Sequence, residues 1–119
     1  MQKIFFPSSR PIFVNEEAVI KKLRKIALQL SKENRNTEAI YLFGSYLKGT
    51  AGLHSDADVL VVLKEDRRRP IDRLDEFILA FLEAPIPVDV LAATMAEVDL
   101  ALRDGNRFFL DAVKGLRLA

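Results

Sequence analysis

The sequence contains no cysteine, which excludes disulfide bonds, thiol catalysis and thiolate metal sites. It has one histidine, His54, so a zinc site built from several histidines of this chain is also excluded. The 18 basic and 17 acidic residues leave a formal net charge of only +1, so no overall field draws the protein to nucleic acid or to an anionic membrane. Any polyanion that it binds must therefore be held by a local arrangement of residues.

Long apolar runs are absent as well. No stretch approaches the roughly 20 residues of a membrane span, and the N-terminus does not resemble a cleaved secretory signal. We therefore expect a cytoplasmic protein. Its 119 residues fit a single domain over 1–119, with residues 1–14 as an extended lead-in. Such a short chain encloses little, so as an enzyme it would rely on a partner chain to complete the walls of its site.

Along the chain, segments with apolar residues at helical spacing alternate with short continuous apolar runs. Apolar residues at helical spacing and short continuous apolar runs predict an α/β sandwich, with a mixed sheet of about four strands packed with helices. We expect helices over 16–30, 70–82 and 94–103, and strands over 39–43, 56–63 and 88–91. Residues 107–110 fit either a fourth strand or the start of a terminal helix, and the sequence slightly favours the strand.

Gly44-Ser45 directly follows the first buried strand. Glycine permits the tight backbone that main-chain N–H groups need to approach phosphate oxygens. If a short helix begins at Ser45, its first N–H groups would point at an anion, and Lys48 would add a positive charge one turn later. The alternative is an ordinary turn at the end of a strand, where glycine and serine are common.

Asp56 and Asp58 stand at the mouth of a strand that is otherwise apolar. Residues two apart share one face of a strand, so the two carboxylates could hold Mg²⁺ between them, with help from substrate phosphates. Without a metal ion, the like charges would repel each other on a largely buried edge. Asp56 by itself could equally cap a turn.

Asp89 is a third acid in an apolar strand, 88–91. If that strand lies beside the one that bears Asp58, all three acids meet at one rim, which suits two-metal phosphoryl or nucleotidyl transfer. Asp89 could instead be a partly exposed residue of an edge strand.

The run Leu42-Phe43-Gly44-Ser45, followed after ten residues by Asp56-Ala57-Asp58, resembles the signature of polymerase-β-like nucleotidyltransferases. The stretch from Tyr41 to Val62 is similar to the minimal, stand-alone branch of that superfamily in particular. The resemblance implies that fold, and it implies that Gly44, Ser45 and Lys48 bind the triphosphate of ATP. It also implies that Asp56, Asp58 and Asp89 are catalytic and hold Mg²⁺, with two ions expected. Lys48 stands where many relatives carry arginine, so bidentate phosphate contact is lost there.

By the same resemblance, the expected reaction transfers AMP from ATP to a hydroxyl of a partner macromolecule. The expected partner is a small helical protein of the HEPN type, the toxin that a minimal nucleotidyltransferase antitoxin modifies. A binding module that neutralises its partner by contact alone is the alternative from another class. A small-molecule nucleotidyltransferase is disfavoured, because such enzymes generally carry a further domain. The sequence leaves open the preferred nucleotide and a homo-oligomer, and it does not point to nucleic acid.

Overall fold

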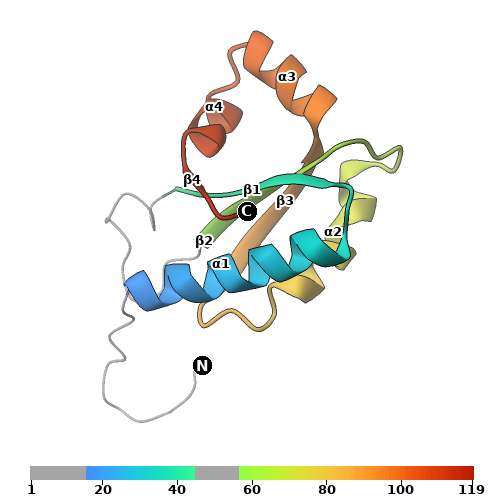
Figure 1. The fold of residues 1–119 in the computed structure, drawn as a ribbon. Helices are drawn as coiled ribbons and strands as arrows, with labels where there is room; N and C mark the ends of the chain where they lie inside the picture. The colour runs from blue at the N-terminus through green and yellow to red at the C-terminus, as the bar shows by residue number, and fades with distance from the viewer. Residues whose placement is uncertain (1–15, 45–56) are drawn as a thin grey trace.

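The structure is a computed structural model that describes residues 16–44 and 57–119 (Figure 1). The described elements run in the order α1 (Glu16–Glu33), β1 (Thr37–Phe43), β2 (Ala57–Leu63), α2 (Pro70–Ala80), β3 (Val88–Thr94), α3 (Met95–Arg103), α4 (Arg107–Val113) and β4 (Leu116–Arg117). The expected lead-in over residues 1–14 lies outside the described residues.

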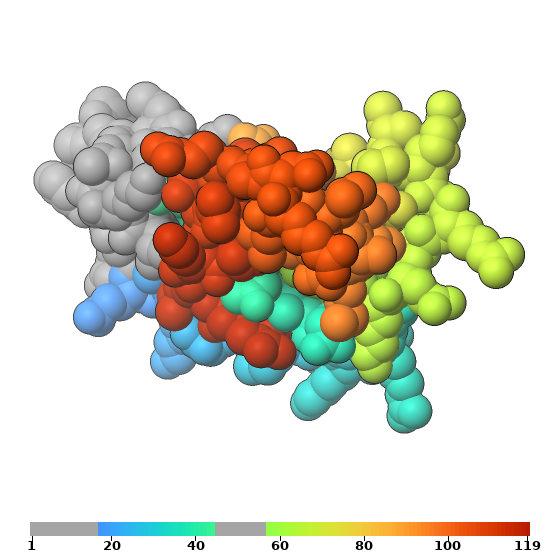
Figure 2. Space-filling view, turned by 90° about the horizontal axis from the view of Figure 1, so that it is seen from above, coloured from blue at the N-terminus to red at the C-terminus, as the bar shows by residue number. Residues whose placement is uncertain are grey.

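The strands form one mixed sheet in the order β3-β2-β1-β4. β2 and β3 are parallel, whereas β1 runs antiparallel to both β2 and β4. Helices α1 and α2 lie on one face of the sheet and α3 and α4 on the other (Figure 1). From above, α3 and α4 form a continuous layer over the sheet (Figure 2). The expected sandwich with four strands is therefore confirmed.

Strand alternation divides the apolar residues between two cores. Val59, Val61 and Leu63 of β2 pack under α1 and α2, in a cluster that includes Leu23 and Phe77. Leu60 and Val62 point to the other face, into a second cluster with residues of α3 and α4. Because both faces of β2 are covered, this strand reads as a nearly continuous apolar run, as the sequence indicated.

The expectation for residues 107–110 was wrong, because these residues begin helix α4. Asn106 caps that helix through its side-chain oxygen, which accepts a hydrogen bond from the Phe109 N–H at 3.3 Å. The periodicity of a short apolar run does not distinguish a helix from a strand. Here the N-cap at Asn106 favours the helix. The fourth strand comes later: Leu116 and Arg117 pair with Leu42 and Tyr41 of β1.

A capping box stabilises the start of α3. The Thr94 hydroxyl accepts from the Glu97 N–H at 3.1 Å, and the Glu97 carboxylate accepts from the Thr94 N–H at 2.8 Å. Within the described part of the chain, no helix is both long enough and apolar enough to span a membrane.

Candidate functional site

Two of the three predicted acids are neighbours across adjacent strands. In the parallel register of β2 and β3, Asp58 is the partner of Asp89. Adjacent strands lie about 4.8 Å apart, so the two side chains start side by side on one face of the sheet. Asp58 is half-buried and Asp89 is exposed, which agrees with the position of β3 at the edge of the described sheet. The arrangement gathers negative charge at one point of the rim.

Both acids lie on the face of the sheet that α3 and α4 cover. Asp58 shares its side of β2 with Leu60, and Asp89 shares its side of β3 with Leu91; both leucines pack in the cluster under α3 and α4. The acids stand at the beginning of these parallel strands, which is the end of the sheet where β1 finishes. Packing therefore closes the candidate site on the side toward the middle of the strands.

Gly44 brings the end of β1 against Asp58. Its φ is +86°, a conformation that residues with a side chain rarely adopt. A Cβ placed on Gly44 would collide with the Asp58 carboxylate. Phe43, one residue earlier, pairs with Asp58 in the sheet. The backbone of Gly44 thus lies close to one of the predicted acids, and the predicted approach to phosphate oxygens stays a prediction.

Three of the predicted site residues, Ser45, Lys48 and Asp56, lie outside the described residues, so their roles stay predictions. In residues 16–44 and 57–119, no group of three or more histidine, aspartate or glutamate side chains is placed to hold a metal ion. Asp58 and Asp89 supply two carboxylates, and the predicted third, Asp56, is not among the residues searched.

A second cluster of charged residues lies at the opposite end of the same two strands. Arg73 of α2 is only 2% exposed, and its guanidinium donates to the Glu97 carboxylate at 2.6 and 3.1 Å. It also donates to the carbonyl oxygens of Asp66, Arg68 and Ala92. These hydrogen bonds join the loop after β2 to the start of α3. Arg73 therefore fixes how the helices on both faces meet the sheet.

The titration behaviour of this cluster follows its hydrogen bonds. The side-chain hydrogen bond from Arg68, aided by its charge, lowers the pKa of Asp66 from 3.8 to about 2. The hydrogen bond from Arg73 lowers the pKa of Glu97, and the same bond raises the pKa of Arg73. Arg68 also pairs with Glu76 at 3.0 Å. Acids at this end are thus held in their charged form by arginine partners.

Sequence reasoning missed Arg73, although a signal was present. Arg73, Phe77 and Phe81 are spaced four residues apart and share the buried face of α2. A charged residue within an apolar stripe needs a hydrogen-bonding partner, and the partly exposed Glu97 supplies it. In the charged connection before α2, Arg68 and Arg69 pair with the nearby acids Asp66 and Asp72.

The family model described as "Nucleotidyltransferase domain" matches residues 20–114, which is most of the chain. The chain belongs to this family. The match includes β1, β2 and β3, and so both Asp58 and Asp89 lie within the nucleotidyltransferase domain.

A curated relative from Methanocaldococcus jannaschii, named "Putative protein adenylyltransferase", is 32% identical over 83 residues. That alignment covers 67% of this chain and 56% of the relative, so the chain spans about half the length of this curated protein. A crystal structure from Sulfolobus solfataricus, described as a "putative nucleotidyltransferase", matches with a TM-score of 0.59 and 26% identity. It covers 71% of this chain and 75% of the other, and it supports the nucleotidyltransferase fold.

A further match is the structure of a toxin–antitoxin complex with AMP-PNP, at a TM-score of 0.48 and 24% identity. It covers 81% of this chain and 72% of the other.

Proposed function

We propose that this nucleotidyltransferase domain is a Mg²⁺-dependent enzyme that transfers AMP from ATP to a hydroxyl of a partner macromolecule. The observation that carries the proposal is the register of Asp58 with Asp89, directly beside the left-handed Gly44. Two carboxylates adjacent to a glycine at the end of a strand provide cation ligands and a close-fitting backbone in one place. The relative from Methanocaldococcus jannaschii carries the name of a protein adenylyltransferase, which supports ATP as the donor.

The described residues fit a divalent cation with oxygen ligands. Mg²⁺ is usually bound by one or two carboxylates together with substrate phosphates, and Asp58 and Asp89 present their carboxylates from adjacent positions. We propose that they hold two ions together with Asp56, with Gly44 leaving room because it has no side chain. When bound, such ions stabilise the attacking and leaving oxygens of an in-line displacement.

Residues of the chain itself would hold and orient the reactants. The main chain at Gly44 and Ser45, the Ser45 hydroxyl and the Lys48 ammonium group would bind the triphosphate. Asp89, the exposed acid, is the group proposed to accept the proton of the attacking hydroxyl. The hydroxyl oxygen bonds to the α-phosphorus, the bond from that phosphorus to the bridging oxygen breaks, and pyrophosphate leaves.

The acceptor we propose is a small helical protein of the HEPN type, the partner that the family resemblance implies, with this chain as its antitoxin. The outward face of α2 supports docking of a helical protein. It exposes three large apolar side chains, namely Ile71, Ile78 and Leu79, and Leu82 is exposed in the turn that follows the helix. An exposed apolar face of this kind commonly marks a protein interface.

The test is transfer of label from α-labelled ATP to protein, with Mg²⁺ and a lysate of the host. We compare the unmutated chain with Asp58→Asn and with Asp99→Asn, an exposed acid on α3 that serves as the matched control. The proposal expects one labelled band with the unmutated chain and the control, and none with Asp58→Asn or with a chelator. The same band from all three proteins would contradict it.

A further inference from the structure

Phe108 is an exposed aromatic ring that two other rings hold in place. Its side chain is 49% exposed, although it makes edge contacts on two sides. Its ring centroid lies 5.2 Å from that of Phe43, at an interplanar angle of 90°, and 5.4 Å from that of Phe109, at 79°. Phe43 is 7% exposed and belongs to the core. Phe108 is therefore the outer member of a packed aromatic row, and about half of its surface stays open.

This aromatic row leads directly to the candidate site. Phe43 pairs with Asp58 across β1 and β2, so their side chains are neighbours on the face that α4 covers. Gly44 follows Phe43 and lies against the Asp58 carboxylate. Phe108 is thus separated from the acids by a single side chain.

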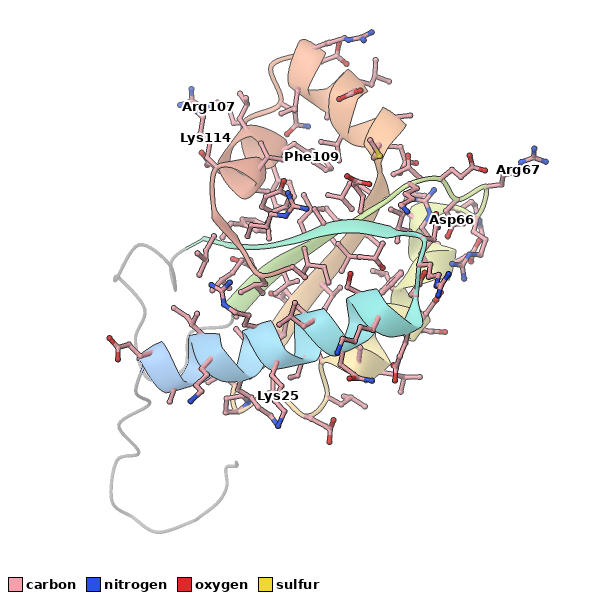
Figure 3. The ribbon with its side chains drawn as sticks, viewed as in Figure 1. Lys25, Asp66, Arg67, Arg107, Phe109 and Lys114 are labelled. Atoms are coloured by element: carbon pink, nitrogen blue, oxygen red, sulfur yellow. The ribbon has the colours of Figure 1, made fainter. Side chains whose placement is uncertain are left out.

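The charges on α4 suit an anionic ligand. Arg107 and Lys114 are exposed, and neither makes a hydrogen bond or ion pair within the described residues. Both lie at the outer side of α4, above the end of the sheet where β1 finishes (Figure 3). Asp111 lies on the same exposed side, so the local balance is one positive charge.

We propose that Phe108 is the stacking surface for the base of the nucleoside triphosphate, an inference that rests on the proposed function. An aromatic ring held by two neighbours loses little freedom when a base stacks on it. Every base has a π-face, so stacking adds affinity without hydrogen-bond readout. Phe108 therefore strengthens binding of ATP and GTP alike, and the choice between them is made elsewhere.

The experiment is a titration of the full-length chain, in Mg²⁺, with ATP, with GTP and with inorganic tripolyphosphate. Phe108→Ala weakens binding of both nucleotides about tenfold, the factor that about 1.4 kcal/mol of stacking corresponds to. Binding of tripolyphosphate, which has no base, does not change. Phe108→Trp keeps the affinity of the unmutated chain for both nucleotides. Leu100→Ala, which removes a similarly exposed apolar side chain from α3, is the control and changes neither affinity.

Two results overturn the inference while leaving the proposed function intact. One is an unchanged ATP affinity in Phe108→Ala, including the case in which that variant only loses binding to a protein partner. The other is an equal loss for ATP and tripolyphosphate, which would mean that the substitution distorts the site. In both cases, label transfer that depends on Asp58 continues to support the enzyme. If the unmutated chain neither binds ATP nor transfers label, the proposed function fails and this inference fails with it.

Discussion

The two ends of the parallel pair β2 and β3 use acidic residues in opposite ways. At the carboxyl end, Asp66 and Glu97 accept hydrogen bonds from arginines, and Arg73 buries its guanidinium among carbonyl oxygens. At the beginning of the strands, Asp58 and Asp89 are in register with each other and lie beside the backbone of Gly44. Figure 3 shows Asp66 at one end of the sheet and α4, with Arg107 and Lys114, at the other.

The difference separates acids that stabilise the fold from acids that we propose to bind a cation. An acid that is paired with arginine stabilises the fold, because its charge is compensated and its oxygens are hydrogen-bonded. Two acids placed next to each other raise the electrostatic energy of the folded state unless other groups compensate their charge, and a bound cation would be one such group. The same residue type thus anchors helices at one end of the sheet and forms a candidate metal site at the other.

The largest effect is expected at Arg73. Arg73→Met leaves the Glu97 carboxylate without its arginine and removes the donor to three carbonyl oxygens, so the free energy of unfolding falls by about 3 kcal/mol or more. Chemical denaturation measures this change. Arg69→Met is the control, because its exposed pair with Asp72 is worth about 0.5 kcal/mol. Equal losses in the two variants would show that Arg73 does not anchor the fold.

One substitution made at both ends tests the comparison directly. Asp58→Asn lowers label transfer about 100-fold or more with little change in unfolding, because it weakens a proposed cation ligand. Asp66→Asn does the reverse: it destabilises the fold by about 1–2 kcal/mol and leaves transfer intact at a temperature where the protein is folded. Loss of activity in both variants to the same extent would remove the distinction between the two ends.

Two glycines with positive φ provide a smaller, matched test. Gly105→Ala costs about 1 kcal/mol, because its φ of +72° is strained for alanine but no atom stands in the way. Gly44→Ala costs about 1–2 kcal/mol more, since its methyl group also collides with the Asp58 carboxylate. We expect label transfer to fall only in the Gly44 variant. The free energy of unfolding and the rate of label transfer are measured for each variant. Equal losses of stability in Gly44→Ala and Gly105→Ala would contradict the close contact of Gly44 with Asp58.

The smallest effect is a dependence of stability on pH. Asp66 has a pKa of about 2 in the folded state, below its ordinary value of 3.8, so the unfolded chain binds its proton more readily. The stabilisation is complete above about pH 4 and is lost as the pH falls toward 2. We expect roughly 1 kcal/mol, because Arg68 is half-exposed and the pair is screened. Denaturation of Asp66→Asn alongside the unmutated chain from pH 5 to pH 2 measures the difference. If the free energy of unfolding of Asp66→Asn falls with pH as steeply as that of the unmutated chain, the pH dependence comes from Glu97 instead, whose pKa is also lowered.

The candidate site residues could be picked out from the sequence because their signals are local. Asp58 and Asp89 interrupt apolar strands, and glycine at position 44 directly follows a third apolar run. Each of these departures from an apolar pattern is visible without knowing the fold. The register that makes Asp58 the neighbour of Asp89 is a different matter, since strand pairing is set by packing on both faces of the sheet.

The sequence-based prediction failed where the local sequence is compatible with both a strand and a helix. Residues 107–110 have the composition of a strand, but Asn106 provides a cap and Phe109 packs inward, so a helix forms. Phe108 then stays exposed against Phe43, a contact between residues 65 positions apart that no local pattern encodes.

The sequence by itself indicated the family, an α/β sandwich and the acids of the candidate site, because residue type and apolar spacing are properties of short segments. Only the tertiary structure decided which acids lie together and which are paired with arginine. It placed Asp58 beside Asp89 and Gly44, and it brought Arg73 to Glu97 across 24 residues. The reason is physical: a charge is favourable or costly according to the groups that packing brings next to it, and those groups come from distant parts of the chain.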